Sequence, residues 1–282
     1  MDTELEDELG DVVQKARDGR SWSQEDLARA CGVAVADIGR IENCDLIPDD
    51  SRIVRIAAAL NLHGPSLVAV ARKTYLPAAP KPDPDFDLVC LRVLIGMYPV
   101  KCYLLICKQT RAAAAIDTGG NPEAVIRKAR ELGVTPRKIL LTHTHADHAG
   151  GLNRLDAEFN CPTWVDRAEP RPPGSRDLRW VGEGDCIELG KLRIRVIATP
   201  GHTAGGVCYR VNGSVVSGDA IFAGSMGRAN VSFQALFDAV AGKLLTLPDA
   251  TALYPAHGPA TTVGQEKRHN PFFAAPGPSP GP

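Results

Sequence analysis

Apolar residues recur at helical spacing in the first quarter of the chain. Leu5, Leu9, Val12 and Ala16 lie three or four positions apart, so they share one face of a helix. Three further segments with the same kind of spacing follow before the pattern changes. The sequence therefore predicts a small all-α domain over residues 1–73.

Strand and helix patterns alternate from residue 88 onward. The predicted strands are Leu88–Ile95, Cys102–Cys107, Ala112–Ile116, Ile139–Leu141, Thr163–Val165, Leu192–Ala198, Val207–Val211, Ser214–Val216 and Ala252–Tyr254. The predicted helices are Glu123–Leu132, Leu152–Glu158 and Phe233–Leu247. Such alternation, with polar loops at strand ends, predicts an α/β layered domain over residues 88–273.

Two stretches lack any apolar period. Residues 74–87 are rich in proline, which predicts an interdomain linker with stiff polyproline character. Residues 274–282 contain only Ala, Gly, Ser and Pro and are expected to be disordered.

Composition narrows the choice of protein class. At 44% hydrophobic and 23% charged residues, with a net charge of −1, the chain gives no overall argument for nucleic acid or membrane binding. The acidic start lacks the form of a secretion signal, and no apolar run approaches the ~18–20 residues of a membrane helix. The eight cysteines form no C-x-x-C pair, so we expect reduced thiols and a cytoplasmic location.

The first domain has the layout of a helix-turn-helix. A capping-box sequence starts at Ser23, a tight turn falls at Gly32-Val33, and Arg40-Ile41-Glu42 follows in the next helix. Over residues 8–62 this arrangement resembles the Cro/repressor-type helix-turn-helix family. In that family the second helix of the motif enters the major groove of DNA.

The sequence of this module does not decide whether it binds DNA or another protein. The start of the second helix, Ala34-Val35-Ala36-Asp37, offers no side chain suited to a base edge. Residues 1–75 carry nine Lys/Arg against fourteen Asp/Glu, a net of −5, which disfavours phosphate binding. Gln24 and Arg40 are the candidate DNA contacts. Docking to another protein, or homodimerisation through the module, is the alternative interpretation.

Three histidines and an aspartate lie within six residues, directly after an apolar run. They are His143, His145, Asp147 and His148 in the sequence T-H-T-H-A-D-H. Imidazole and carboxylate together suit zinc or iron better than calcium or magnesium. A chance cluster is a weak alternative, because the chain has only seven histidines and three of them lie here.

Three further clusters follow other predicted strands. T-P-G-H-T contains His202, S-G-D contains Asp219, and P-A-H-G contains His257. A single histidine after a strand is usually a surface residue. Four polar clusters at successive strand ends instead indicate one site, because sites in layered α/β folds assemble there.

Taken together, these motifs resemble the metallo-β-lactamase superfamily, and its glyoxalase II-like branch most closely. The resemblance covers residues 88–273 and implies an αββα sandwich after the small all-α domain. It also implies that His143, His145 and His202 hold one metal ion, that Asp147, His148 and His257 hold another, and that Asp219 bridges them. Asp117, in a D-x-G loop, is implied to orient the ligands.

Two zinc ions in such a site can share a water and lower its pKa toward ~7. Asp147 would orient the metal-bound hydroxide and take its proton, so no serine or cysteine nucleophile is needed. The sequence therefore predicts hydrolysis of a thioester or similar activated acyl substrate, small or carrier-bound. Only 25 residues follow His257, too few for the C-terminal domain with which glyoxalase II holds glutathione.

Two other functions stay open on the sequence. A persulfide dioxygenase of the same superfamily would use a single iron at His143, His202 and Asp219. A DNA-binding regulator would use the metal domain to sense a ligand. Metal analysis distinguishes the persulfide dioxygenase from the zinc hydrolase. A gel shift, with its salt dependence, tests for the DNA-binding regulator.

Overall fold

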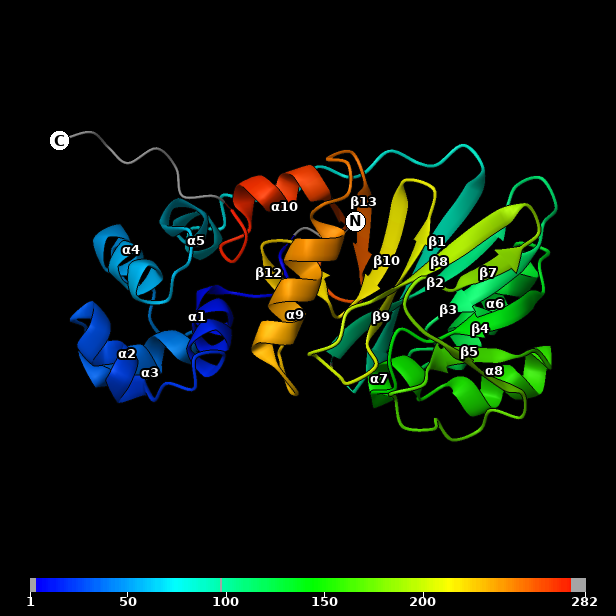
Figure 1. Cartoon of the computed structure of the whole chain (residues 1–282), viewed down its shortest axis with the longest axis horizontal. Helices are drawn as coiled ribbons and strands as arrows, with labels where there is room; N and C mark the ends of the chain where they lie inside the picture. Colours follow the sequence, from blue (N-terminus) through cyan, green and yellow to red (C-terminus); the bar gives the residue numbers. More distant parts are fainter. Residues whose placement is uncertain (1–3, 97, 275–282) are drawn as a thin grey trace.

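The computed structural model describes residues 4–96 and 98–274. The predicted disordered tail lies outside these ranges except for its first residue. Within them, no helix has the length and apolar character needed to cross a membrane. Figure 1 shows a helical module beside a larger α/β part, with strands and helices stacked in layers.

Five helices make up the helical module. They are α1 (Leu9–Asp18), α2 (Gln24–Cys31), α3 (Val35–Glu42), α4 (Asp50–Ala59) and α5 (Gly64–Ala71). Ser23 caps α2 with the expected capping box, accepting a hydrogen bond from the backbone of Asp26. Gly32 then turns the chain with a φ of 65°, a conformation that costs glycine little. Helix α5 was not predicted because its apolar residues leave no polar face to mark a period.

Two six-stranded sheets form the centre of the α/β part. The first has the order β1 (Phe86–Ile95), β2 (Tyr98–Cys107), β3 (Ala113–Ile116), β4 (Pro136–Leu140), β5 (Thr163–Asp166) and β6 (Leu178–Val181). The second has the order β14 (Thr261–Thr262), β13 (Ala252–Pro255), β10 (Ser214–Gly218), β9 (Val207–Val211), β8 (Leu192–Ala198) and β7 (Cys186–Leu189). Their facing side chains, among them Tyr103, Ile116 and Val196, form a buried apolar layer.

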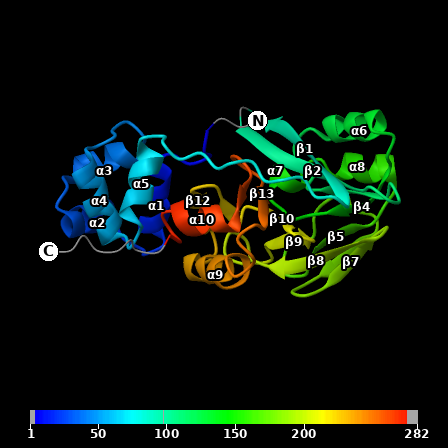
Figure 2. The same cartoon turned by 90° about the horizontal axis from the view of Figure 1, so that it is seen from above.

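Helices cover both outer faces of this sandwich. Helices α6 (Pro122–Glu131) and α8 (Leu152–Phe159) pack on the first sheet. Helices α9 (Phe233–Ala239) and α10 (Val263–His269), with the π-helical segment η1 (Val240–Leu244), pack on the second. Figure 2 shows the layers from above. The expected αββα sandwich is confirmed.

Most predicted strands and helices agree with the structure to within a few residues. The predicted helix Phe233–Leu247 is split between α9 and η1. The sequence did not predict β6, β7, β14, α10, the one-turn α7 (Ala146–Ala149) or the hairpin of β11 (Ile221–Phe222) and β12 (Ser225–Met226). Helix α10 has seven residues but only one large apolar residue, Val263, and each of the others has two to four residues, too few to establish a period.

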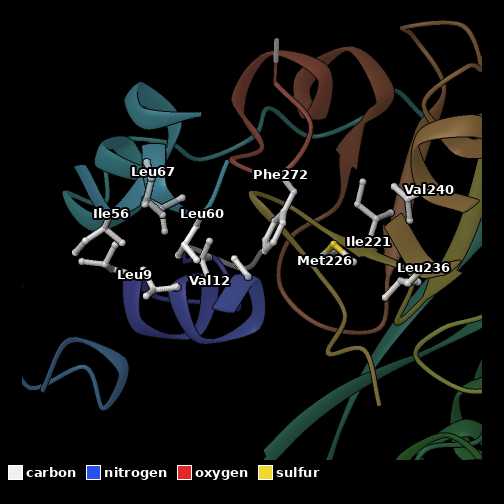
Figure 3. Packing of buried hydrophobic residues seen from close by; sticks show 14 of the residues in the cluster. Leu9, Val12, Ile56, Leu60, Leu67, Ile221, Met226, Leu236, Val240 and Phe272 are labelled. Atoms are coloured by element: carbon white, nitrogen blue, oxygen red, sulfur yellow. The ribbon is translucent and has the colours of Figure 1, made fainter. Parts of the chain in front are cut away.

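One apolar core continues from the helical module into the α/β part. Leu9, Val12 and Leu60 of the module belong to the same buried cluster as Met226 and Phe272 of the α/β part (Figure 3). The packing is close, because a Cβ added at Gly19 would lie 2.3 Å from the ring of Phe233. The two parts are therefore packed as one body.

The proline-rich stretch between the two parts is held at two points. The hydroxyl of Tyr75 donates to the buried carboxylate of Glu266 at 2.9 Å, and the backbone of Ala78 donates to the side chain of Gln265 at 2.6 Å. Glu266 also accepts hydrogen bonds from Thr261, the backbone of Gly224, and Asn270. This carboxylate thus joins the proline-rich stretch, α10 and the β11–β12 turn.

Candidate metal centre

Strand direction brings the four sequence clusters to one edge of the sandwich. Strands β3, β4 and β5 are parallel, so Asp117 and the loop from His143 to His148 leave the first sheet on the same side. Strands β10 and β13 are also parallel, which places Asp219 and His257 together. Strand β8 runs in the direction of β10, since both are antiparallel to β9, and it delivers His202 to this edge.

Three imidazole nitrogens converge at one point of this edge. His145 Nδ1 lies 3.1 Å from His143 Nε2 and 3.0 Å from His202 Nε2. Nitrogens bound to one tetrahedral zinc ion at ~2.0–2.1 Å would lie roughly 3.4 Å apart, close to the observed spacing. This histidine triad therefore has the spacing of a metal site.

A second donor group lies beside the triad. Asp147 Oδ2 is 3.7 Å from His148 Nε2 and 3.7 Å from His257 Nε2. In this group, as in the triad, the possible ligand atoms all lie within 4.8 Å of one another. We call Asp147, His148 and His257 the mixed triad.

Asp219 lies between the histidine triad and the mixed triad. Its Oδ2 is 3.4 Å from His202 Nε2, and its Oδ1 is 3.4 Å from His148 Nε2 and 3.7 Å from His257 Nε2. One oxygen thus faces each triad. A carboxylate in this position can contribute a ligand to two metal ions at once.

Four histidines are fixed with Nε2 directed into the centre, because each donates its Nδ1–H to an acceptor. The acceptors are Thr142 Oγ1 for His143 (3.1 Å), Asp117 Oδ2 for His148 (2.8 Å), the Arg228 carbonyl for His202 (2.6 Å) and the Pro99 carbonyl for His257 (3.0 Å). A carbonyl or carboxylate can only accept, so it selects the tautomer that leaves Nε2 for a metal.

Two buried carboxylates support the loops around these ligands. Asp117, in the left-handed region at φ 57°, accepts from the backbone and hydroxyl of Thr142 at 2.8 and 2.9 Å as well as from His148. Glu169 accepts from the backbone and hydroxyl of Thr144 and from the backbone of Gly205. Glu169 therefore ties the loop of the first cluster to the loop that carries His202.

The residues present fit a metal centre. Among the residues that the structure describes, the buried atoms His148 Nε2 and Asp219 Oδ1 make no hydrogen bond, although buried polar atoms normally do. The two atoms lie 3.4 Å apart, on the side of Asp219 that faces the mixed triad. Nitrogen and carboxylate donors in this number suit a divalent transition metal.

The two triads differ in protonation. Burial lowers the pKa of His143 well below its ordinary value, and burial also lowers the pKa of His202. Burial acts on His148 too, but the charges of Asp117 and Asp219 together outweigh it and raise the pKa of His148 well above its ordinary value. The pKa of His257 is raised as well, since the attraction of Asp147, 3.7 Å away, and the charge of Asp219 oppose the effect of burial.

Metal binding by the mixed triad should therefore depend more steeply on pH than metal binding by the histidine triad. A raised pKa keeps the proton on His148 and His257 in the metal-free chain, and a metal ligand must lose it. Affinity at the mixed triad should rise with pH through these raised values, while His143 and His202 are already neutral. Zinc titrations at pH 6 and pH 8, with proton release recorded, measure this. The prediction is contradicted if the first and the second zinc ion bound per chain show the same pH dependence.

The structure separates the predicted site residues into two groups. It brings together the seven predicted ligands and Asp117 in the α/β part. Gln24 and Arg40 lie apart from them in the helical module, where Gln24 donates to Glu42 at 2.8 Å and Arg40 is exposed near Asp37. Supporting roles for Glu169 and Arg228 were not predicted, since neither lies in a motif and both act through contacts distant along the chain.

Known proteins are similar to both parts of the chain. Residues 95–257 match the family model described as the metallo-beta-lactamase superfamily, and residues 13–67 match one described as helix-turn-helix. The hydroxyacylglutathione hydrolase GloC of Haemophilus influenzae is 31% identical over 192 residues, which cover 60% of this chain and 91% of that protein.

Two solved structures are similar in fold. ETHE1 from Myxococcus xanthus has a TM-score of 0.59 and 28% identity, over 66% of this chain and 84% of that one. TTHA1623 in a di-iron-bound form has a TM-score of 0.57 and 31% identity, over 64% of this chain and 99% of that one.

Proposed function

The chain belongs to the metallo-beta-lactamase superfamily, and on that premise we propose that it is a dinuclear zinc hydrolase of thioesters or similarly activated acyl compounds. The observation that carries the proposal is Asp219, whose two oxygens face two separate triads of possible ligands. Similarity to a hydroxyacylglutathione hydrolase favours an acyl ester of a thiol as substrate.

The seven donors would hold two ions. His143, His145 and His202 would hold one, Asp147, His148 and His257 the other, and Asp219 would bridge them. Two such ions, when bound, supply a water of lowered pKa as nucleophile and a Lewis acid that polarises the acyl carbonyl.

Asp147 is placed to accept the proton of the attacking water. Its carboxylate is partly exposed and lies at the edge of the centre, within 3.7 Å of His148 Nε2 and His257 Nε2. Burial raises the pKa of Asp147, but the attraction of His257 and the charge of His148 outweigh it and lower that pKa. The carboxylate is therefore ionised near neutral pH, where it can orient the water and accept its proton.

A cysteine nucleophile is not needed. Cys208 is buried in β9, beside Thr199, and burial raises the pKa of its thiol to about 12. A thiol with such a pKa is almost wholly protonated near neutral pH and is a poor nucleophile. Its position and its pKa both indicate a packing role.

A cavity of about 140 Å³ adjoins His257 and offers room for part of a substrate. Glu4 and Glu6 of the N-terminal segment line one side, and Arg92 and Lys101 of the β1–β2 hairpin also line it. Side chains of both charge signs suit a polar group on the substrate away from the reacting carbonyl. The cavity is therefore consistent with a substrate that has a further polar group beyond the acyl group that reacts.

A substrate panel with metal analysis tests the proposal. The full chain, loaded with zinc or with iron, is offered a thioester, a lactone and a persulfide, and product and oxygen uptake are followed. We expect thioester hydrolysis with two metal ions per chain. One iron per chain together with oxygen uptake on the persulfide would replace the proposal by a persulfide dioxygenase using His143, His202 and Asp219.

The helix-turn-helix match supports DNA binding as a second candidate function. Helices α2 and α3, joined at Gly32, have the layout in which the second helix enters the major groove. Gln24, whose amide is bonded to Glu42, and the exposed Arg40 are the proposed backbone contacts. A gel shift with genomic fragments at two salt concentrations tests this, and homodimerisation without a shift would favour the docking role.

A further inference from the structure

One short segment lies between the helical module and the metal centre. It comprises residues 220–228, begins directly after Asp219 and contains the β11–β12 hairpin. We call it the bridging segment. It contacts the helical module on one side and predicted metal ligands on the other.

On one side the bridging segment touches three predicted metal ligands. The ring of Phe222 packs edge-on against the ring of His257, with centroids 5.6 Å apart. Gly227 lies so close to Asp219 that an added Cβ would be 1.8 Å from the Asp219 carbonyl oxygen. The carbonyl of Arg228 accepts the Nδ1–H of His202 at 2.6 Å. A shift of this segment would therefore move ligands of both triads.

On its other side the bridging segment is held by a buried ion pair of the helical module. Lys15 of α1 is bonded to the carboxylate of Asp7 and donates to the carbonyl of Met226 at 2.9 Å. The hydroxyl of Ser225 donates to the same carboxylate. The ammonium of Lys15 also lies 5.1 Å from the centre of the Phe222 ring, within cation–π range.

A second connection runs along the surface. The guanidinium of Arg228 donates to Gln14 at 2.7 Å and to Asp18 at 3.2 Å, both on α1. This ion pair is exposed, so it contributes little by itself. The Lys15–Asp7 pair is buried, and losing one partner of a buried pair leaves the other charge uncompensated. Lys15 and Asp7 are therefore the stronger link.

We propose that Lys15 and Asp7 are positioning residues for the metal centre, acting through the bridging segment on His202, Asp219 and His257. The inference rests on the metal centre of the proposed function but not on its substrate. Coupling of this kind is reciprocal. Metal binding should stabilise the docking of α1, and a partner that displaces α1 should weaken metal binding.

Replacing Lys15 by methionine tests the inference in the full chain. Methionine keeps much of the side-chain volume but removes the charge that holds Asp7 and the Met226 carbonyl. We expect the affinity for zinc, measured by competition with a chelator, to fall about tenfold, at the lower end of the effect of removing partners of metal ligands. The control is Arg29→Met, because Arg29 is a 78% exposed cation of the same module whose observed partner is the nearby Asp26.

A double variant separates positioning from general damage. Lys15→Met with Asp7→Asn removes both charges of the pair and should recover part of the lost zinc affinity, because no buried charge is left alone. Asp7→Asn alone serves as the milder variant if Lys15→Met does not fold.

Hydrogen exchange of the α1 amides distinguishes coupling to the metal centre from a purely structural role of Lys15 and Asp7, because a purely structural role would not make this exchange depend on zinc. Adding zinc to the unmodified chain should slow the exchange of α1 amides, and this effect should shrink in Lys15→Met, or in Asp7→Asn where that variant is used. The inference is overturned if zinc leaves α1 exchange unchanged, or if the variant binds zinc as tightly as the control. Coupled zinc binding without thioester hydrolysis would instead reject only the proposed substrate.

Discussion

Replacing Asp147 by asparagine should lower kcat on a thioester substrate by about 10²–10⁴-fold, the usual contribution of a positioned proton acceptor. The amide has nearly the same size as the carboxylate but cannot take a proton from the attacking water. The histidine triad does not include Asp147 and should keep its metal ion. Steady-state kinetics and metal content, measured on the same samples, test this result.

The matched control for Asp147 is Asp238→Asn, which removes an exposed carboxylate on α9 whose observed partner is Gln234. Its kcat and metal content should equal those of the unmodified chain. Near-normal turnover by Asp147→Asn with metal bound would exclude the proton-accepting role. Loss of one of the two metal ions would instead identify Asp147 mainly as a ligand.

Replacing Asp117 by asparagine should weaken metal binding by about 10–100-fold, the range for partners that orient metal ligands. One oxygen of the carboxylate accepts from the backbone of Thr142 and the other from His148 and the Thr142 hydroxyl, so the amide nitrogen of an asparagine faces a donor in either place. An asparagine therefore holds His148, and the Nε2 that it directs into the centre, less firmly. The metal-free chain should also lose about 3–5 kcal/mol of stability, because His148 loses its buried, negatively charged partner.

Chelator competition and urea unfolding of the metal-free chain measure the two effects of Asp117→Asn separately. Asp156→Asn is the control, since Asp156 is a buried carboxylate of the same domain that pairs with Arg176 away from the centre. It should lose stability but keep its metal affinity. Equal metal affinity in the two variants would show that Asp117 has no orienting role.

The sequence predicted the fold where a signal was local. Strand β8 was predicted with its observed bounds because apolar and charged residues alternate over its first five positions, and the structure buries the apolar ones. The candidate metal ligands could be selected because their histidine and aspartate motifs follow predicted strands, and the structure brings these side chains together. Strand direction then explains how residues more than a hundred positions apart meet.

The supporting residues could not be predicted because their role depends on distant contacts. Glu169 lies in a proline-rich loop with no motif, yet it joins Thr144 to Gly205. Lys15 occupies one position of an amphipathic helix, and only the folded chain places it beside Met226. A carbonyl such as that of Arg228 leaves no sequence signal at all, since every residue has one.

The apolar core shared by the two parts affects how the protein can be handled. A chain cut in the proline-rich stretch would leave Val12 and Leu60 on one fragment, and Met226 and Phe272 on the other, without their packing partners. Contiguous exposed apolar surface of this kind promotes aggregation. Fragments of this protein should therefore be produced together, so that each can cover the exposed apolar surface of the other.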